Sequence, residues 1–509
     1  MDKGVVYLIG AGPGDPKLIT LKAVECMRAA DVIVYDRLVN PVLLKYAGSN
    51  VEKIYAGKVP DGHVLKQKEI NSILVDRAKQ GKVVARLKGG DPFIFGRGGE
   101  EAEELAAAGV PFEIVPGVTS AVAVPAYAGI PLTHRDHTST VAFVTGNEDP
   151  DKAESAVDWE KIGTGAGTLV FLMGMANLPK IVAKLLANGR KPTTPVAVIR
   201  WGTRPEQYTV EGCLGDIVEK VRAEKITNPA VIIVGSVCRL RATLKWFEQK
   251  PLFGKRVLVT RAREQASVLT EAIERLGGEA LEFPTIAIAP PLDWGPLDAA
   301  IAAVTSFDWL IFTSVNGVKY FFKRLRETGK DLRDMGPAKI CAIGPKTRQV
   351  LESSGLRVDY VPTEYRADKI AEGLKDHVGH GTKILMARAD IAPKSLAQAL
   401  EGLGASVTDV TAYRTVPVAD NAALIREWLA QGRIQVVTFT SSSTVQNFVK
   451  AMDVYDPAAL LSETLVACIG PVTATTARQL GLRVDIQPKE YTIEGLVDAI
   501  VGYFAKERK

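Results

Sequence analysis

The chain has 509 residues, 47% hydrophobic and 24% charged, an ordinary composition for a globular protein of roughly two to four domains. The net charge of +5 does not suggest a nucleic-acid-binding surface, although it suits small acidic ligands held by local Arg and Lys clusters. The five cysteines are scattered and form no CxxC pair, which argues against a disulfide framework and a metal site. Because the sequence lacks an apolar run of about 18 residues and a signal-peptide pattern, we expect no membrane association and a cytoplasmic location.

The first 243 residues alternate between predicted strands and helices. Short apolar strands are predicted at 4–9, 31–35, 51–55, 83–87 and 112–115, with helices at 17–29, 66–79 and 99–108. A second set of strands follows at 140–145, 168–173, 196–200 and 230–234, with a helix at 180–187. The alternation is typical of α/β layers around a parallel sheet. We therefore expect two α/β lobes, at about residues 1–115 and 116–243, and then a linker at 244–253.

A glycine-rich stretch at Val84–Glu101, VARLKGGDPFIFGRGGEE, lies between a predicted strand and a predicted helix. Each glycine inside an element costs about 0.5–1 kcal/mol relative to Ala, so such a run is kept where backbone bends sharply or approaches a ligand. Turns between strand and helix are where α/β proteins place cofactors. The alternative is a loop that needs several positive-φ positions.

An earlier glycine turn, VYLIGAGPGDP at Val6–Pro16, resembles the dinucleotide fingerprint GxGxxG. Asp15 occupies the place of the third glycine, and Pro13 lies inside the turn. Asp15 would repel a diphosphate at the helix N-terminus, which argues against NAD or FAD. An acidic turn fits a positively charged ligand such as a sulfonium; alternatively, Asp15 caps the helix that starts at Lys17.

Five motifs in this half resemble the tetrapyrrole methylases, most closely the uroporphyrinogen-III C-methyltransferases. They are GAGPGDP at Gly10–Pro16, VIVYDRLV at Val32–Val39, RLKGGDPFIFGRGGEE at Arg86–Glu101, VPGVTS at Val115–Ser120 and GIPLTHRD at Gly129–Asp136. The similarity covers roughly residues 3–243. It implies two α/β lobes with S-adenosylmethionine in a cleft between them, tetrapyrrole substrates and a homodimer formed through this half of the chain.

The same resemblance implies residue roles. It assigns cofactor contacts to Pro13, Gly89, Gly90, Asp91, Ile94, Thr119, Ser120, Met173, Gly202 and Ala230. Asp36 is the implied proton acceptor and Lys58 the implied proton donor; alternatively, Asp36 forms an ion pair with a neighbour and Lys58 is an exposed surface residue. Met173 is alternatively a core residue. Because arginine pairs with carboxylates in a bidentate manner, the implied substrate-binding residues are Arg37, Arg97 and Arg135.

Beyond residue 253 the chain contains an internal duplication. GKRVLVTRA at Gly254–Ala262 matches GTKILMARA at Gly381–Ala389, so residue 381 corresponds to residue 254 at an offset of 127. At the same offset, Phe312–Ser314 matches Phe439–Ser441, and further matches follow at 126. Repeated matches at one offset predict two similar α/β lobes, and a cleft between two lobes suits a ligand.

The duplicated half resembles the uroporphyrinogen-III synthases across about residues 254–509. The motifs are VLVTRA at Val257–Ala262, FTSVNGV at Phe312–Val318, IGPKT at Ile343–Thr347, TAYRT at Thr411–Thr415, FTSSS at Phe439–Ser443 and IGPVTA at Ile469–Ala474. The resemblance implies two flavodoxin-like lobes, one from about 254–284 with 417–509 and the other from 285–416. It implies closure of linear hydroxymethylbilane with inversion of the last ring, without a metal or organic cofactor.

Tyr413 matches a family tyrosine that is implied to assist departure of the substrate hydroxyl; the alternative is a tyrosine that packs its ring at a strand end. Hydroxyls at strand-to-helix turns and free N–H groups of helix N-termini are expected to bind the substrate carboxylates. The hydroxyl residues at these turns are Ser314, Thr347, Ser441 and Thr473. Alternatively, these residues are ordinary helix caps.

Together the two halves predict a bifunctional α/β enzyme. One half makes uroporphyrinogen III, and the other methylates it twice to precorrin-2, for sirohaem or cobalamin. One alternative is a related corrinoid methylase with a C-terminal ligand-sensing domain. A methylase acting on RNA is disfavoured by the modest charge, so neither nucleic acid nor a membrane is an expected partner.

Overall fold

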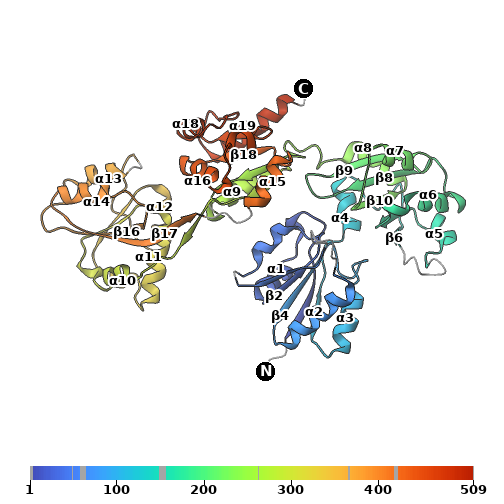
Figure 1. Cartoon of the computed structure of the whole chain (residues 1–509), viewed down its shortest axis with the longest axis horizontal. Helices are drawn as coiled ribbons and strands as arrows, with labels where there is room; N and C mark the ends of the chain where they lie inside the picture. Colours follow the sequence, from blue (N-terminus) through green and yellow to red (C-terminus); the bar gives the residue numbers. More distant parts are fainter. Residues whose placement is uncertain are drawn as a thin grey trace. The chain divides into compact units, whose positions relative to one another are not determined.

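The computed structural model describes residues 4–48, 50–57, 65–147, 156–261, 263–364, 367–417 and 422–507. The chain divides into two compact units: the first holds residues 1–256 with 272–280 and 501–509, and the second holds 257–271 and 281–500. The described residues form four sheets, each layered with helices (Figure 1). The expected α/β class is confirmed, whereas the domain boundaries at 243 and 254 stay predictions.

The first sheet is fully parallel. Its strands lie in the order β3 (Glu52–Tyr55), β2 (Val32–Tyr35), β4 (Val83–Lys88), β1 (Val5–Gly10) and β5 (Phe112–Val115). One face packs against α1 (Leu21–Ala29) and the other against α2 (Gln67–Lys79) and α3 (Gly98–Ala107) (Figure 1). The five strands and three helices were predicted, although α1 begins later than expected because a 3-10 turn, Pro16–Leu18, precedes it.

The second sheet is mixed. Its strands lie in the order β6 (Val141–Thr145), β7 (Thr168–Leu172), β10 (Ala230–Val234), β8 (Pro195–Arg200) and β9 (Tyr208–Cys213), and only β6 and β7 are parallel neighbours. Its helices are α4 (Ser120–Tyr127), α5 (Trp159–Gly165), α6 (Leu178–Ala187), α7 (Ile217–Ala223) and α8 (Arg241–Leu244). Four strands and α6 were predicted. The edge strand β9 was not, and neither were α5, α7, α8 and α4, which contains Pro125.

The segment expected to be a linker, 244–253, packs tightly within the first unit. The Phe247 ring contacts the edge of Tyr127 with centroids 4.9 Å apart, and Leu252 is fully buried. Glu248 accepts hydrogen bonds from Arg241 at 2.7 Å and from Gln207 at 2.8 Å. These contacts fix the segment to the second sheet's helices and loops.

The duplicated half contains the other two sheets. One has the order β12 (Glu279–Glu282), β11 (Arg256–Val259), β18 (Val436–Phe439) and β19 (Leu465–Cys468). The other has the order β13 (Ile286–Ala289), β17 (Ser406–Pro417), β16 (Lys383–Ala389), β14 (Trp309–Phe312) and β15 (Lys339–Ala342). Strands from both ends of this half thus share the first of these sheets, and the middle of the half forms the second.

Helices cover these sheets along the whole half. They are α9 (Arg263–Arg275), α10 (Gly295–Ala302), α11 (Val315–Glu327), α12 (Pro345–Ser353), α13 (Ala367–Leu374), α14 (Ser395–Gly402), α15 (Ala422–Ala430), α16 (Ser442–Met452), α17 (Pro457–Leu460), α18 (Pro471–Gln479) and α19 (Ile493–Glu507). Along β14, Leu310 and Phe312 pack among α10–α12, whereas Trp309 and Ile311 pack among α13 and α14. This alternation buries both faces of the strand, as its continuous apolar sequence predicts.

The duplication is confirmed in the backbone. Ser314, between β14 and α11, has φ −162° and ψ 155°, and Ser441, between β18 and α16, has φ −163° and ψ 161°. The next turns also match, because Gly344 and Gly470 are both extended and each precedes a proline that opens a helix. The repeat therefore preserves the strand-to-helix turns that were singled out from the sequence.

Three glycines join the turns at the carboxyl edge of the first sheet. A Cβ atom on Gly117 would lie 2.6 Å from the Cα of Gly10, and one on Gly10 would lie 2.7 Å from the carbonyl oxygen of Gly90. Gly12 and Gly90 exchange backbone hydrogen bonds at 3.2 and 2.8 Å, and Gly90 has φ +70°. The turns after β1, β4 and β5 therefore touch backbone to backbone, which leaves no room for side chains.

This contact predicts a specific instability. Gly117→Ala should lower the free energy of unfolding by about 1–3 kcal/mol, because the new methyl group forces the turns apart. Urea unfolding of the whole chain, followed by circular dichroism, measures the change. The control is Gly99→Ala in the first turn of α3, where a Cβ atom meets nothing within 4 Å and should be neutral or stabilising. Equal stability of both variants would contradict the proposed contact.

Candidate functional site

A cavity in the first unit brings together residues from both of its sheets. Its lining comes from the segments that follow β1, β2 and β4, from α4, from the segment at the end of β8, and from the start of β10. The residues are Gly12, Pro13, Leu38, Gly89, Gly90, Ser120, Val124, Ile199, Trp201, Gly202, Arg204, Pro229 and Ala230. Among them are six residues that the sequence assigned to the cofactor: Pro13, Gly89, Gly90, Ser120, Gly202 and Ala230. The walls are mostly glycine backbone and apolar side chains.

The other four residues assigned to the cofactor lie outside this lining. Asp91 accepts hydrogen bonds from the backbone N–H groups of Phe93 at 2.8 Å and Gly117 at 3.0 Å, so its carboxylate holds the glycine turns together. Thr119 caps α4 by accepting from the N–H of Ala121 at 3.3 Å. The remaining two, Ile94 and Met173, are 37% and 45% exposed.

The structure resolves two alternatives that the sequence left open, one at Met173 and one at Asp15. Met173 is exposed and has φ +58°, so it is not a core residue. Asp15 accepts from the N–H of Lys17 at 2.8 Å and from the Tyr127 hydroxyl at 2.7 Å, and it caps the short turn that begins at Pro16. The capping interpretation of Asp15 is confirmed. Burial and the bond to Asp15 together raise the pKa of Tyr127.

A buried charge cluster lies beneath the same edge of the first sheet. One oxygen of Glu101, which is fully buried, accepts from Arg86 Nε at 3.1 Å, Lys88 Nζ at 2.8 Å and Gln67 Nε2 at 3.0 Å. Its other oxygen has no hydrogen-bond partner among the residues that the structure describes. Arg86 Nη2 also lies 3.7 Å from Asp36 Oδ2, so the expected alternative of an ion pair at Asp36 is present. Burial lowers the pKa of Lys88.

This cluster was missed by the sequence reasoning, although a signal was present. Arg86 and Lys88 are two residues apart on a strand, so both point to the face covered by α2 and α3. Val84, two residues earlier, is fully buried on that face. Two cations on a buried face require a buried anion, and Glu101 on α3 supplies it.

The cationic residues expected to bind substrate are on the surface. Arg37 and Arg135 are exposed. Arg97 is exposed, has φ +59° and forms a two-bond pair with Glu100 at 2.9 and 2.6 Å. Lys58, the implied proton donor, lies outside the described residues. The structure therefore brings Asp36 close to Arg86 and leaves the three arginines exposed.

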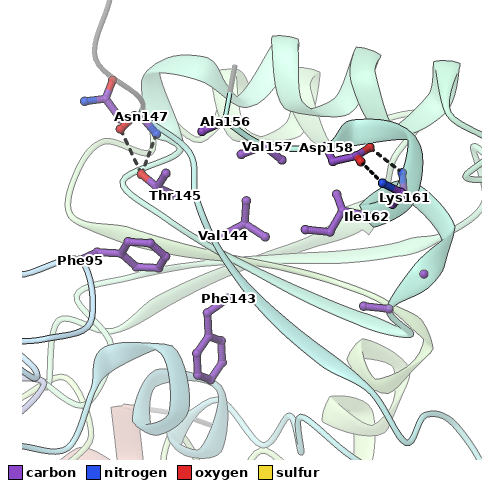
Figure 2. A pocket seen from close by; sticks show the side chains of 12 residues that line it. Phe95, Phe143, Val144, Thr145, Asn147, Ala156, Val157, Asp158, Lys161 and Ile162 are labelled. Atoms are coloured by element: carbon purple, nitrogen blue, oxygen red, sulfur yellow. Dashed lines mark hydrogen bonds and ion pairs between the residues drawn. The ribbon is translucent and has the colours of Figure 1, made fainter. Parts of the chain in front are cut away.

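A larger cavity, of about 640 Å³, lies beside β6 and α5 (Figure 2). Its walls include the apolar side chains of Phe143, Val144 and Ile162, and Asp158 pairs with Lys161 at 2.8 Å. None of the residues assigned to the cofactor or the substrate is part of its lining. Cavity volume alone therefore does not identify the cofactor site. The candidate is the cavity lined by Gly12, Gly89, Gly90 and Gly202, called the glycine-walled cavity below.

In the second unit, Tyr413 on β17 is the central candidate. It is 7% exposed, and its hydroxyl lies 3.0 Å from Oγ of Ser314. Its ring packs against Tyr320 with centroids 5.8 Å apart. Burial raises the pKa of Tyr413, and the hydrogen bond with Ser314 opposes that rise. Both the packing and the chemical interpretation of Tyr413 are thus compatible with its position.

The hydroxyl residues of the duplicated turns fall into two pairs. Ser314 accepts from the N–H of Gly317 at 3.0 Å and Ser441 from that of Thr444 at 3.3 Å, so the capping interpretation is confirmed for both. Thr347 and Thr473 are 4% and 5% exposed, so they present little hydroxyl surface. Binding of substrate by these four residues stays a prediction.

Two broader features limit the kinds of site that the described residues contain. Every helix in the described part of the chain is too short or too polar to cross a membrane. Within the same residues, no three His, Cys, Asp or Glu side chains are grouped in a way that suits a metal ion. The two candidate regions are therefore the glycine-walled cavity and the surroundings of Tyr413.

Two family models match the chain. Residues 5–218 match the Tetrapyrrole (Corrin/Porphyrin) Methylases, and residues 267–498 match Uroporphyrinogen-III synthase HemD. Both matches agree with the families that the sequence motifs resembled.

Three relatives show how far the similarity extends. A porphyrin biosynthesis protein HemD of Ruminiclostridium josui is 38% identical over 501 residues, which is 98% of each chain. A uroporphyrinogen-III C-methyltransferase of Priestia megaterium is 55% identical over 234 residues, 46% of this chain and 98% of the relative. An S-adenosyl-L-methionine-dependent uroporphyrinogen III methyltransferase of Methanosarcina barkeri (strain Fusaro / DSM 804) is 52% identical over 241 residues, 47% of this chain and 94% of the relative.

The full-length match and the two family models cover both candidate regions. The chain therefore belongs to the family in which a tetrapyrrole methylase of the uroporphyrinogen-III C-methyltransferase type is fused to a uroporphyrinogen-III synthase.

Proposed function

We propose that this chain is a bifunctional enzyme of tetrapyrrole biosynthesis. Its second half cyclises hydroxymethylbilane to uroporphyrinogen III with ring inversion. Its first half transfers two methyl groups from S-adenosylmethionine to that product, which yields precorrin-2 for sirohaem or cobalamin. The observation that carries the proposal is the glycine-walled cavity, because six residues from five separate segments, assigned to the cofactor in advance, line it together.

The lining of this cavity fits S-adenosylmethionine. Glycines at 89, 90 and 202 place backbone without side chains on the wall, which lets a ligand approach the chain closely. A Cβ atom at Gly202 would collide with the Val124 side chain, so this wall has to be glycine. The name of the Methanosarcina barkeri relative supports the same cofactor. When bound, the sulfonium supplies the methyl group.

The chain's own residues then have distinct tasks in methyl transfer. The cavity walls orient the reacting groups and exclude water. Asp36 accepts the proton that leaves the macrocycle, with its carboxylate held at 3.7 Å from Arg86. Lys58 is the proposed proton donor, and Arg37, Arg97 and Arg135 are the proposed partners of the substrate carboxylates. We further propose a homodimer through this half and a cytoplasmic location.

Asp36→Asn tests the proton acceptor. Methyl transfer to uroporphyrinogen III should slow by about 10²-fold or more, because an amide does not accept the proton. Affinity for S-adenosylmethionine, measured by calorimetry, should not change because Asp36 is not part of the cavity lining. Asp31→Asn, at the opposite end of the same strand, is the control and should retain full activity. Wild-type turnover of the Asp36→Asn protein would remove Asp36 from the mechanism.

Tyr413→Phe tests the synthase half and separates it from a ligand sensor. The wild-type protein should convert hydroxymethylbilane to the type III isomer without S-adenosylmethionine, whereas a sensor would only bind it. The variant should form this isomer about 10²-fold more slowly, because the acid that assists the leaving hydroxyl is lost. Tyr320→Phe removes a hydroxyl from the neighbouring ring and should not slow the reaction. Isomer analysis by chromatography measures both rates; an unchanged Tyr413→Phe rate would make Tyr413 a packing residue.

Fusion of the two activities should raise the local concentration of uroporphyrinogen III at the methylating site. Full-length Asp36→Asn and Tyr413→Phe proteins, mixed in equal amounts, place one working activity on each chain. Wild-type protein with the same number of working sites should reach dimethylated product with a shorter lag after addition of hydroxymethylbilane. Equal lags at all protein concentrations would show that the fusion gives no such advantage.

A further inference from the structure

The hydrogen bond between Tyr413 and Ser314 sets the direction in which the tyrosine can donate its proton. In the described part of the chain, Ser314 Oγ at 3.0 Å is the one hydrogen-bond partner of the Tyr413 hydroxyl. The ring itself is immobilised by burial and by Tyr320. Whether the Tyr413 proton is available to a substrate therefore depends on which of the two hydroxyls donates in this bond.

Ser314 is held in place by the helix that it caps. Its Oγ accepts from the N–H of Gly317 at 3.0 Å, which fixes one acceptor site of the oxygen. Gly317 in turn has no room for a side chain, because a Cβ atom there would lie 2.6 Å from the carbonyl oxygen of Ala387 on β16. The first turn of α11 is thus pressed against the sheet that carries Tyr413, and the serine O–H lies within donating distance of the Tyr413 oxygen.

The duplication shows that this contact is not a requirement of capping. Ser441, at the equivalent turn, caps α16 with the same backbone angles, but its Oγ lies 2.9 Å from that of Ser443. The residue 127 positions before Tyr413, which corresponds to it in the repeat, is Ile286. Both serines cap a helix, and Ser314 in addition contacts a tyrosine from the other copy of the repeat.

We propose that Ser314 is a positioning residue for Tyr413: its hydroxyl donates to the Tyr413 oxygen and leaves the tyrosine O–H free for the substrate. This inference rests on the proposed synthase activity. It replaces the expectation that Ser314 binds a substrate carboxylate. The direction of the pKa effect agrees with it, because the Ser314 bond lowers the pKa of Tyr413 as a donor to the phenolate does.

In the proposed ring closure, Tyr413 acts as a general acid. The C–O bond of the hydroxymethyl group breaks, and its electron pair leaves with the oxygen, which takes the Tyr413 proton and departs as water. The pyrrole nitrogen lone pair stabilises the carbon left behind, and the substituted carbon of the last ring attacks it to close the macrocycle. The bond from that ring carbon to its original bridge carbon then breaks, and the unsubstituted carbon of the same ring bonds to the freed bridge carbon and loses its proton. The proton lost from the rearranged ring restores Tyr413, whose phenolate is stabilised meanwhile by the Ser314 O–H.

A double-mutant cycle on the full-length chain tests the inference. Ser314→Ala should lower kcat for type III formation about 10-fold with little change in KM, and Ser314→Thr should restore it because the hydroxyl returns. In the Tyr413→Phe background, Ser314→Ala should have no further effect, since the residue acts through the tyrosine. If the loss persists in that background, or if it is confined to KM, Ser314 binds substrate directly and the inference is overturned.

Ser441→Ala controls for the loss of a helix cap. It should lower the urea midpoint by an amount similar to that for Ser314→Ala, because both serines cap a helix from nearly the same backbone angles. Any loss of activity caused by Ser441→Ala should be the same fold-change in the wild-type background and in the Tyr413→Phe background. Coupling of Ser441→Ala to Tyr413→Phe as strong as that of Ser314→Ala would also overturn the inference. If the wild-type protein makes no type III isomer, the proposed function fails before the cycle begins.

Discussion

The first unit depends on the contact of three glycine backbones at the carboxyl edge of its parallel sheet. Gly10, Gly90 and Gly117 approach so closely that a methyl group on Gly10 or Gly117 would separate them. Asp91 reinforces this contact by accepting the N–H of Gly117 at 3.0 Å. Parallel strands end at a common edge, but only side-chain-free turns can then be joined into one surface. That surface forms one wall of the candidate cofactor cavity.

Charge is buried immediately below this surface. Glu101 gathers three donors on one oxygen, which compensates much of the cost of removing Arg86 and Lys88 from water. The cluster ties α2 and α3 to β4, and Arg86 extends it to Asp36 at 3.7 Å. Asp36 Oδ1 also accepts from the N–H of Leu38 at 3.1 Å, so Arg86 and this backbone bond together orient the carboxylate.

In the duplicated half, the turns that open the helices are repeated, whereas the proposed catalytic tyrosine is not. Ser314 and Ser441 cap equivalent helices with nearly identical backbone angles, and Gly344 and Gly470 open the following ones. Such turns present free N–H groups wherever they occur. Tyr413 has no counterpart of its kind in the repeat, where Ile286 stands, so the proposed acid occurs in one copy only.

The sequence by itself determined the α/β class, most strands, the duplication and the glycine motifs, because periodicity, turn residues and repeats are local signals. It also supplied six residues of the cavity lining through family motifs. Tertiary structure decided what those signals leave open: Asp15 accepts from the Tyr127 hydroxyl, Glu101 neutralises two buried cations, and Ser314 contacts a tyrosine 99 positions away. Each depends on which side chains meet across the fold. The spacing of residues along the chain can indicate that a buried partner is needed, as at Arg86 and Lys88, but it does not identify that partner.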